Sequence, residues 1–356
     1  MKNLTIKKVA LGLFLAGYAA SSAFAVAPVQ TVNTIEGTKP VLNSRGANPI
    51  ANTVTVDIFH ANGTPYTAGD SIYVGDKVRV TYRLTDADGD SDNAAAAKVK
   101  DSFKVFTKAS SGSTWSPVTV QATASYDTAD TELGTIEFEL TSDFIGKSKI
   151  GFVIQPRTEF GAPSEGDWVA IGDIFGGGTP GVGGNGSNPG NSGGPGGGGN
   201  SSGGNTGGGN TGNGTNPGPI VSQTSQLGIF LIDNTGVIQN NESYTKSGTT
   251  LVPKYGERYA AIVWEDTNSD KVLDAGENEL AGFSFEWHVV GNGIAENGNI
   301  TAETGTLNSD GNRSNGNTDD TIFLGSKNLA RTKHNGMYSF TTHKAGIQGY
   351  QLQVKM

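Results

Sequence analysis

Residues 176–219 read GGGTPGVGGNGSNPGNSGGPGGGGNSSGGNTGGGNTGNGTNPGP, and this stretch decides how the chain is organised. It contains no charged or aromatic residue, and Val182 is its only large apolar side chain. Such a composition cannot bury enough apolar surface to offset the entropy lost on ordering. The stretch therefore predicts a flexible, disordered Gly/Asn-rich linker between two segments of ordinary domain size, residues 52–175 and 220–356.

Both flanking segments show the period-two alternation of apolar and polar side chains that is typical of strands with one buried face. Residues 78–84 (VRVTYRL) are the clearest case, and no segment of comparable length has a helical period. The other predicted strands are residues 54–60, 103–108, 118–124, 136–140, 150–154 and 168–174, then 227–232, 259–264, 283–290, 321–324, 337–342 and 348–354. The pattern predicts an all-β fold with two immunoglobulin-like antiparallel β-sandwich domains. Whether these are a diverged tandem pair or two unrelated β-domains stays open.

The N-terminus and the composition predict where the protein is found. Residues 1–25 combine a basic start, a short apolar run and a small-x-small site ending at Ala25, which predicts a cleaved signal peptide. Residues 26–51 are predicted to form an irregular arm that is either disordered or supplies a first edge strand. No later segment has the roughly 20 apolar residues of a membrane helix. The net charge of −9 argues against a nucleic-acid partner. The chain has no cysteine, which excludes a disulfide scaffold, thiol catalysis and cysteine-based zinc sites. We expect a protein that is secreted or held on a bacterial surface.

The sharpest local motif is DTNSDKVLDAGE at residues 266–277. Its spacing is that of an EF-hand-type calcium loop, in which alternate residues direct oxygen atoms to one centre. Position 6, where such loops usually have glycine in a left-handed backbone conformation, is Lys271. The predicted Ca²⁺ ligands, at positions 1, 3, 5, 7, 9 and 12, are Asp266, Asn268, Asp270, Val272 (through its carbonyl), Asp274 and Glu277. The alternative is a solvated acidic hairpin loop without metal.

A second acidic run, DADGDSD at residues 86–92, is the counterpart in the first segment. Asp86, Asp88, Asp90 and Asp92 suit a second calcium ion, but position 12 of such a loop is Ala97, which cannot ligate. A plain acidic turn is the alternative. The four histidines are scattered, and no serine lies in a nucleophile motif. We therefore predict no catalytic residues and a protein that is not an enzyme.

Two resemblances extend these predictions. Residues 263–282 resemble the calcium-loop segment of B-type immunoglobulin-like repeats in bacterial surface adhesins, where the loop stiffens a stalk. The DADGD turn at residues 86–90 and the closing residues 336–356 give the chain a resemblance to small secreted exoproteins associated with intimin/invasin-type outer-membrane proteins. That resemblance implies export with a partner outer-membrane β-barrel protein and a role in adhesion, through that protein or a host-surface protein or glycan. The alternative function is a secreted glycan-binding pair of β-sandwiches.

Overall fold

A computed structural model describes residues 29–45, 49, 51–67, 70–109, 114–175, 194–195, 218–291, 305–325, 335, 347 and 349–356. The predicted signal peptide, most of the predicted linker and the predicted strand 337–342 lie outside the described residues. The chain divides into residues 1–36 and residues 37–356. The described part of the first unit has no strand, and its apolar side chains Val29, Val32 and Ile35 are almost fully exposed.

The regular structure of the second unit is mostly strand, arranged in antiparallel sheets, which confirms the all-β prediction. Its helical elements are one short α-helix, α2, and one 3₁₀ turn, η1, among the residues described. In chain order the elements are β1 (Val41–Asn43), β2 (Thr55–Phe59), β3 (Lys77–Thr85), α2 (Lys98–Ser102), β4 (Lys104–Ala109), β5 (Ser116–Val118), β6 (Thr123–Tyr126), β7 (Leu133–Glu139), η1 (Ser142–Phe144), β8 (Lys147–Ile154), β9 (Val169–Ile171), β10 (Ser225–Ile232), β11 (Arg258–Glu265), β12 (Glu286–Val290), β13 (Gly305–Leu307), β14 (Thr321–Phe323) and β15 (Gln351–Lys355).

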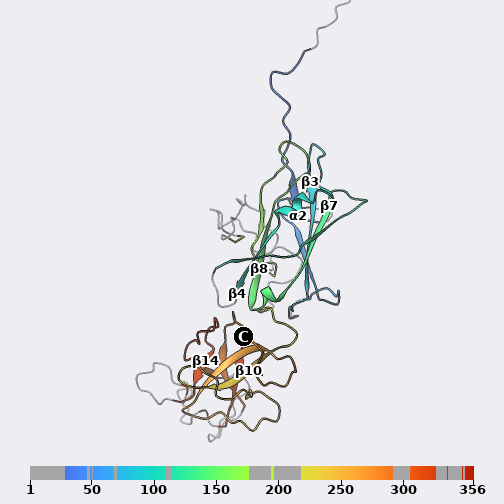
Figure 1. The fold of residues 1–356 in the computed structure, drawn as a ribbon. Helices are drawn as coiled ribbons and strands as arrows, with labels where there is room; N and C mark the ends of the chain where they lie inside the picture. Colours follow the sequence, from blue (N-terminus) through green and yellow to red (C-terminus); the bar gives the residue numbers. More distant parts are fainter. Residues whose placement is uncertain are drawn as a thin grey trace, which may run out of the picture. The chain divides into compact units, whose positions relative to one another are not determined.

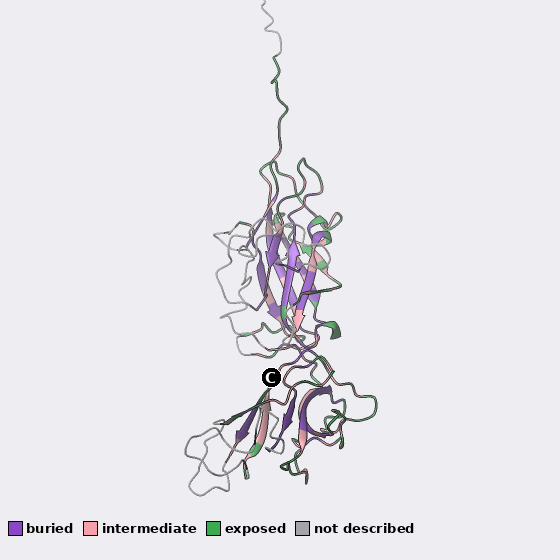
Figure 2. Cartoon of the chain, turned by 90° about the vertical axis from the view of Figure 1, so that its left-hand side faces the viewer, coloured by how far each residue is buried: buried purple, intermediate pink, exposed green. Residues whose placement is uncertain are grey.

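Residues 41–171 form two antiparallel sheets around one core (Figure 1). One sheet has the order β1-β3-β7-β6, with β2 also paired to β3, and the other has the order β5-β4-β8-β9. Val80 and Ile136 from the first sheet belong to the same buried cluster as Phe152 and Ile171 from the second. The burial that Figure 2 shows along these strands follows from the alternation in the sequence, because one side of each strand faces the shared core.

The predicted strand 118–124 is two strands in the structure. β5 pairs with β4 in one sheet, whereas β6 pairs with β7 in the other. Residues 119–122 therefore cross from one sheet to the other. Period-two alternation continues through such a crossing because it reports which side chains are buried, and it carries no information about the hydrogen-bonding partner.

Residues 225–355 contain two smaller antiparallel sheets, with the orders β10-β11-β14 and β13-β12-β15. Their shared core includes Tyr259, Phe283, Trp287 and Ile322. The strand predicted at residues 283–290 is shorter in the structure, since β12 begins at Glu286. Within β12, the predicted apolar face is correct, because Trp287 and Val289 both lie in the core. β13 has only three residues, too few to show a period in the sequence.

The chain returns to the first core after the Gly-rich stretch. Phe175, just before residues 176–219, and Ile220, just after them, are both buried in the core of the first two sheets. The Gly146 N–H donates to the Ile220 carbonyl at 2.9 Å, and the Ile220 N–H donates to the Lys147 carbonyl at 2.9 Å. The sequence assigns Ile220 to the second segment, but the structure places it with the first. The Val221 carbonyl also accepts a hydrogen bond here, from the Val74 N–H at 3.0 Å. Only residues 222–224 lie between Val221 and the start of β10.

This return makes a testable prediction about stability. Ile220→Ala should lower the free energy of unfolding by about 2–5 kcal/mol, because it leaves a cavity in a filled core. Val237→Ala is the control, since Val237 is 58% exposed, and its effect should stay within about 0.5 kcal/mol. Urea unfolding followed by tryptophan fluorescence measures both variants. Equal stability of the two variants would contradict the packing of Ile220 in the first core.

Candidate metal centres

The loop of residues 266–277 follows β11 directly, and no three of its carboxylates, all of which the structure describes, lie within 4.8 Å of one another. Asp266 is fully buried, and its carboxylate accepts the N–H groups of Asp270 at 3.2 Å and Lys271 at 2.9 Å. Asn268 Oδ1 accepts the Asp270 N–H at 3.1 Å, and Asp270 Oδ1 accepts the Val272 N–H at 2.8 Å. Lys271 has φ 59°, so position 6 adopts the left-handed conformation although it is not glycine.

The last two predicted ligands also face this loop. Glu277 accepts the Thr267 N–H at 2.7 Å with one oxygen and the Asp274 N–H at 3.1 Å with the other. Burial alone would raise the pKa of Glu277, but these hydrogen bonds outweigh it and lower the pKa. Asp274 accepts a hydrogen bond from the Asn268 amide at 3.0 Å. The predicted side-chain ligands therefore lie on one ordered loop and accept hydrogen bonds from it.

A tighter carboxylate group lies in the other acidic run. Asp86, Asp88 and Asp90 each offer an oxygen atom within 4.8 Å of the other two, and no other group of three such ligands occurs among the described residues. The Asp88 N–H and Thr38 hydroxyl donate to Asp86 Oδ1 at 2.8 and 3.5 Å, while Asp86 Oδ2 is buried without a hydrogen-bond partner. Three converging carboxylates and a buried free oxygen suit a hard cation such as Ca²⁺.

Two chain segments that sequence reasoning did not connect to this triad approach it closely. The Thr38 N–H donates to Asp88 Oδ2 at 2.6 Å. A Cβ placed on Gly37 would lie 2.5 Å from Asp88 Oδ2, and one on Gly161 would lie 2.4 Å from Asp90 Oδ2. Only glycine permits these approaches. The two glycines give no sequence signal of their own, because the chain contains 53 of them.

Asp92 has a different role from the rest of its run. Its carboxylate accepts hydrogen bonds from the N–H groups of Lys98 and Val99, at 2.9 Å each. These two N–H groups lie at the start of α2, where a helix supplies no carbonyl partner of its own. It also accepts the Tyr126 hydroxyl at 2.8 Å. Burial, together with this hydrogen bond to Asp92, raises the pKa of Tyr126. Asp92 is therefore a buried structural carboxylate that caps α2, and the second calcium candidate is restricted to Asp86, Asp88 and Asp90.

His60 lies between the carboxylates of two aspartates, Asp70 and Asp76. Its Nδ1 lies 3.3 Å from Asp76 Oδ2, and its Nε2 lies 3.3 Å from Asp70 Oδ2. Burial lowers the pKa of His60, but the hydrogen bonds and charges of the two aspartates outweigh it and raise the pKa. Both ring nitrogens thus face carboxylates, which favours a protonated structural histidine.

The other described histidine, His288, offers no catalytic arrangement. The sequence places it on the polar face of its strand, yet it is only 8% exposed. Its Nε2 lies 3.4 Å from a carboxylate oxygen of Glu286, and its Nδ1 is buried without a hydrogen-bond partner. Among the described residues, the hydrogen bonds of the His60 and His288 rings go to carboxylates.

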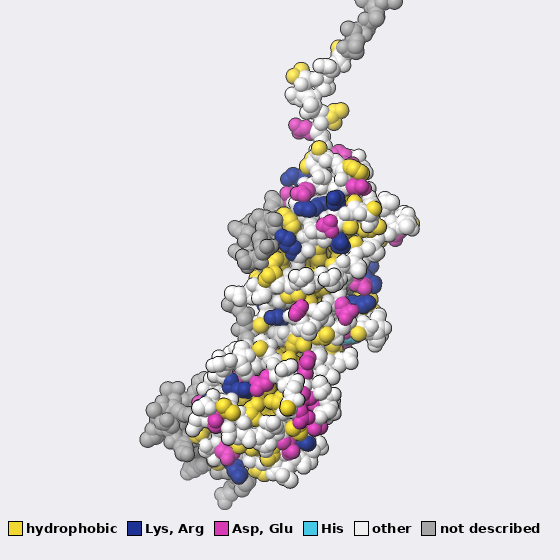
Figure 3. Space-filling view, viewed as in Figure 1, with side chains coloured by type: hydrophobic (Ala, Val, Ile, Leu, Met, Phe, Trp, Pro, Cys, Tyr) yellow, Lys and Arg dark blue, Asp and Glu magenta, His cyan; other side chains and the backbone are white. Residues whose placement is uncertain are grey.

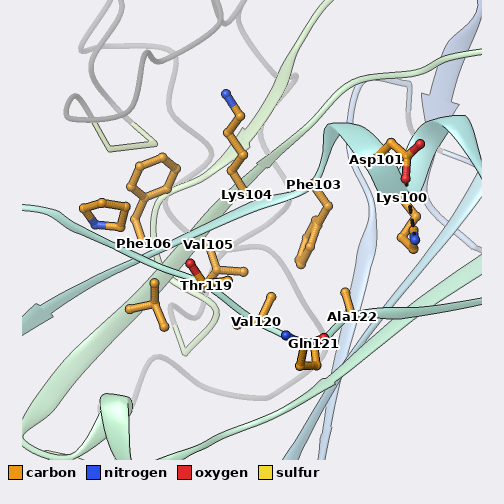
Figure 4. A pocket seen from close by; sticks show the side chains of 12 residues that line it. Lys100, Asp101, Phe103, Lys104, Val105, Phe106, Thr119, Val120, Gln121 and Ala122 are labelled. Atoms are coloured by element: carbon orange, nitrogen blue, oxygen red, sulfur yellow. Dashed lines mark ion pairs between the residues drawn. The ribbon is translucent and has the colours of Figure 1, made fainter.

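A cleft of about 450 Å³ opens beside β4 where residues 119–122 leave the sheet (Figure 4). Phe103, Val120 and Ala122 give it an apolar wall, and Lys100 forms an ion pair with Asp101 at its rim, with 3.5 Å between Nζ and Oδ1. Residues 119–122 of the crossing segment line one side of the cleft. Its lining offers apolar contact and two cations, and it contains no histidine, cysteine or glutamate.

The surface and the comparisons add little to these sites. On the face seen in Figure 3, Lys and Arg side chains are interspersed with Asp and Glu, and no basic patch is visible. Within the part of the chain that the structure describes, no helix has the length and apolar character needed to cross a bilayer. Comparisons with protein-family models, curated proteins and solved structures found no match.

The two metal candidates can be separated by matched substitutions. If Ca²⁺ binds the loop of residues 266–277, Glu277→Gln should weaken Ca²⁺ binding at least about tenfold, because it removes the bidentate ligand. Glu139→Gln is the control, since Glu139 is exposed at the end of β7. Asp88→Asn tests the triad in the same way, with the exposed Asp143→Asn as its control. Calorimetric titration with Ca²⁺ measures all four, and equal affinity of a variant and its control would exclude that centre.

The His60 cluster predicts a pH dependence of stability. Because the pKa of His60 is raised on folding, its stabilising effect is complete below the ordinary value of 6.5 and is lost as the pH rises through the raised folded value. The difference in melting temperature between the unsubstituted chain and His60→Gln should therefore shrink from about pH 5.5 to about pH 8.5. An NMR titration that gave His60 a pKa below 6.5 would contradict this account.

Proposed function

We propose that the chain is a non-enzymatic, secreted bacterial interaction protein of the adhesion type, built from two immunoglobulin-like β-sandwich modules. Its partner is an outer-membrane protein of the intimin/invasin type or a molecule on a host surface. Two observations support this proposal. The described residues form antiparallel sheets, and an apolar groove lies beside β15, which is at the edge of its sheet among the described strands.

The groove beside β15 is the observation that carries the proposal. β15 pairs with β12 over five residues and with no other strand among those described. The groove next to it has a volume of about 290 Å³ and is lined mainly by Val252, Pro253, Tyr255, Ile347, Tyr350 and Leu352. Val252 is 64% exposed there. An edge strand supplies backbone hydrogen bonds and an apolar groove supplies side-chain contacts, which together suit an extended segment of a partner protein.

Calcium has a supporting role in this proposal. An ion bound by the side chains of Asp266, Asn268, Asp270, Asp274 and Glu277 and the carbonyl of Val272 would fix the loop that joins β11 to the following segment. Lys271, which lies within this loop, also accepts the Ser243 N–H at 3.0 Å through its carbonyl. Rigidity imparted to residues 266–277 would thus extend to residues 241–243. The ion would stiffen the second module and take no part in a reaction.

Glycan binding remains the alternative, and the aromatic side chains bear on it. Trp264 and Trp287 are buried in the cores of residues 225–355. Trp115 and Trp168 are partly exposed and pack against one small cluster on the β5-β4-β8-β9 sheet. Two partly exposed rings are a small platform for stacking sugar rings. The groove beside β15 therefore favours a protein partner over a glycan.

Val252→Glu tests the proposal without affecting the core, because Val252 is exposed. The purified chain should bind outer membranes of the producing bacterium, and a charge buried in the groove should weaken that binding at least about tenfold. Val237→Glu is the matched control, with Val237 58% exposed elsewhere on the same module. Co-sedimentation with the membranes measures the bound fraction.

If the two variants bound the membranes equally well, the groove would not be the surface that contacts the partner. Absence of binding by the unsubstituted chain to both these membranes and host-cell surfaces would overturn the adhesion proposal itself. Recovery of the native protein from the periplasm alone would have the same consequence. A test for surface release by a Ca²⁺ chelator would then separate the role of the ion from the role of the groove.

A further inference from the structure

The outer face of the β5-β4-β8-β9 sheet carries an apolar cluster that faces away from the core. Along β4, Val105 and Thr107 point inward, and Lys104, Phe106 and Lys108 point outward, an alternation that Figure 4 shows for Lys104, Val105 and Phe106. Phe106 and Val153 are nevertheless only 1% exposed. They form a cluster with Ala170, and Trp115 and Trp168 pack against it. Something must cover this outward face.

Two residues from the Gly-rich stretch lie on this face. Gly194 and Pro195 are both buried. A Cβ placed on Gly194 would lie 2.3 Å from Cγ of Trp115, so the Gly194 backbone rests directly on that side chain. A Cβ placed on Gly151 of β8 would lie 2.5 Å from Cγ of Pro195. Pro195 therefore fills a hollow that exists because residue 151 has no side chain.

The chemistry of this face suits proline. Aromatic side chains form grooves for proline rings, and proline loses little conformational entropy on binding. The Lys108 ammonium lies 4.9 Å from the centre of the Trp115 ring and the Lys104 ammonium 5.9 Å from that of Trp168, so both rings also carry a nearby cation. The stretch itself offers a proline between glycines at Gly194-Pro195-Gly196, where no neighbouring side chain hinders a close approach.

We propose that this face, made by Phe106, Trp115, Gly151 and Val153, is a binding site for a glycine-flanked proline segment, and that the chain's own Pro195 occupies it. The tether between the sheet and Pro195 raises the local concentration of the segment to the millimolar range, so a weak contact suffices for occupancy. This site is distinct from the groove beside β15, so the proposal for one site can be wrong while the proposal for the other is correct.

The test compares two prolines of the same stretch in the full mature chain. The four tryptophans are replaced by fluorotryptophan, which gives four ¹⁹F resonances that single Trp→Phe variants assign. Pro195→Ala should move the Trp115 resonance toward its position in the unfolded chain and leave Trp264 and Trp287 unchanged. Pro189→Ala, the control, should leave all four resonances in place. Identical spectra for the two variants would overturn the proposal.

A second measurement tests recognition of the segment from outside the chain. A peptide with the sequence of residues 191–200 should return the Trp115 resonance of Pro195→Ala to its original position at millimolar concentration, and the same peptide with alanine for proline should not. The unsubstituted chain should need several-fold more peptide for any change, because its own segment competes. If the Trp115 resonance of the unsubstituted chain depended on protein concentration, the occupant would be a second copy, and the intramolecular contact would be wrong.

Discussion

The burial of Ile220 in the first core is the contact on which the organisation of the chain depends. Phe175 and Ile220 are buried in the same cluster, so residues 176–219 leave one core and return to it. The residues on both sides of the Gly-rich stretch, Phe175 and Ile220, are thus anchored in the first pair of sheets. The connection to β10 consists of residues 222–224, whose Ser222 N–H and Thr224 carbonyl are bound to Ser225 and Asp266 respectively.

Two of the acidic residues show why a metal-binding pattern in sequence needs a structure to interpret it. Asp92 and Asp266 occur in similar alternating runs, and both are almost completely buried. The Asp92 carboxylate accepts hydrogen bonds from the start of α2 and from Tyr126, whereas the Asp266 carboxylate accepts both of its hydrogen bonds from backbone N–H groups of its own loop. The same residue type in two similar acidic runs therefore has a structural role in one run and a place in a candidate ligand set in the other.

The strands of the fold were largely predictable, and the contacts between distant segments were not. Residues 78–84 gave β3 within one residue at each end, because alternation over a long strand is a strong signal. The crossing at residues 119–122, the three-residue β13 and the approach of Gly37 to Asp88 depend on partners far away in sequence. The loop of residues 266–277 gives a sequence signal because all of its candidate ligands are local, whereas the pairing of His60 with Asp70 and Asp76 has no comparable spacing signature.

Ile220 and Pro195 also show how a stretch with the composition of a flexible linker can be held at particular points. Loop-closure entropy grows slowly with length, so extending a loop from about 11 to about 44 residues costs about 1.2 kcal/mol. Full burial of one isoleucine side chain contributes about 1.5–3 kcal/mol. A single apolar residue at the end of a long Gly-rich run therefore offsets the extra cost of its length. Composition averaged over such a run describes its Gly, Asn, Ser and Thr residues, while its anchoring depends on a few positions such as Pro195 within it and Ile220 directly after it.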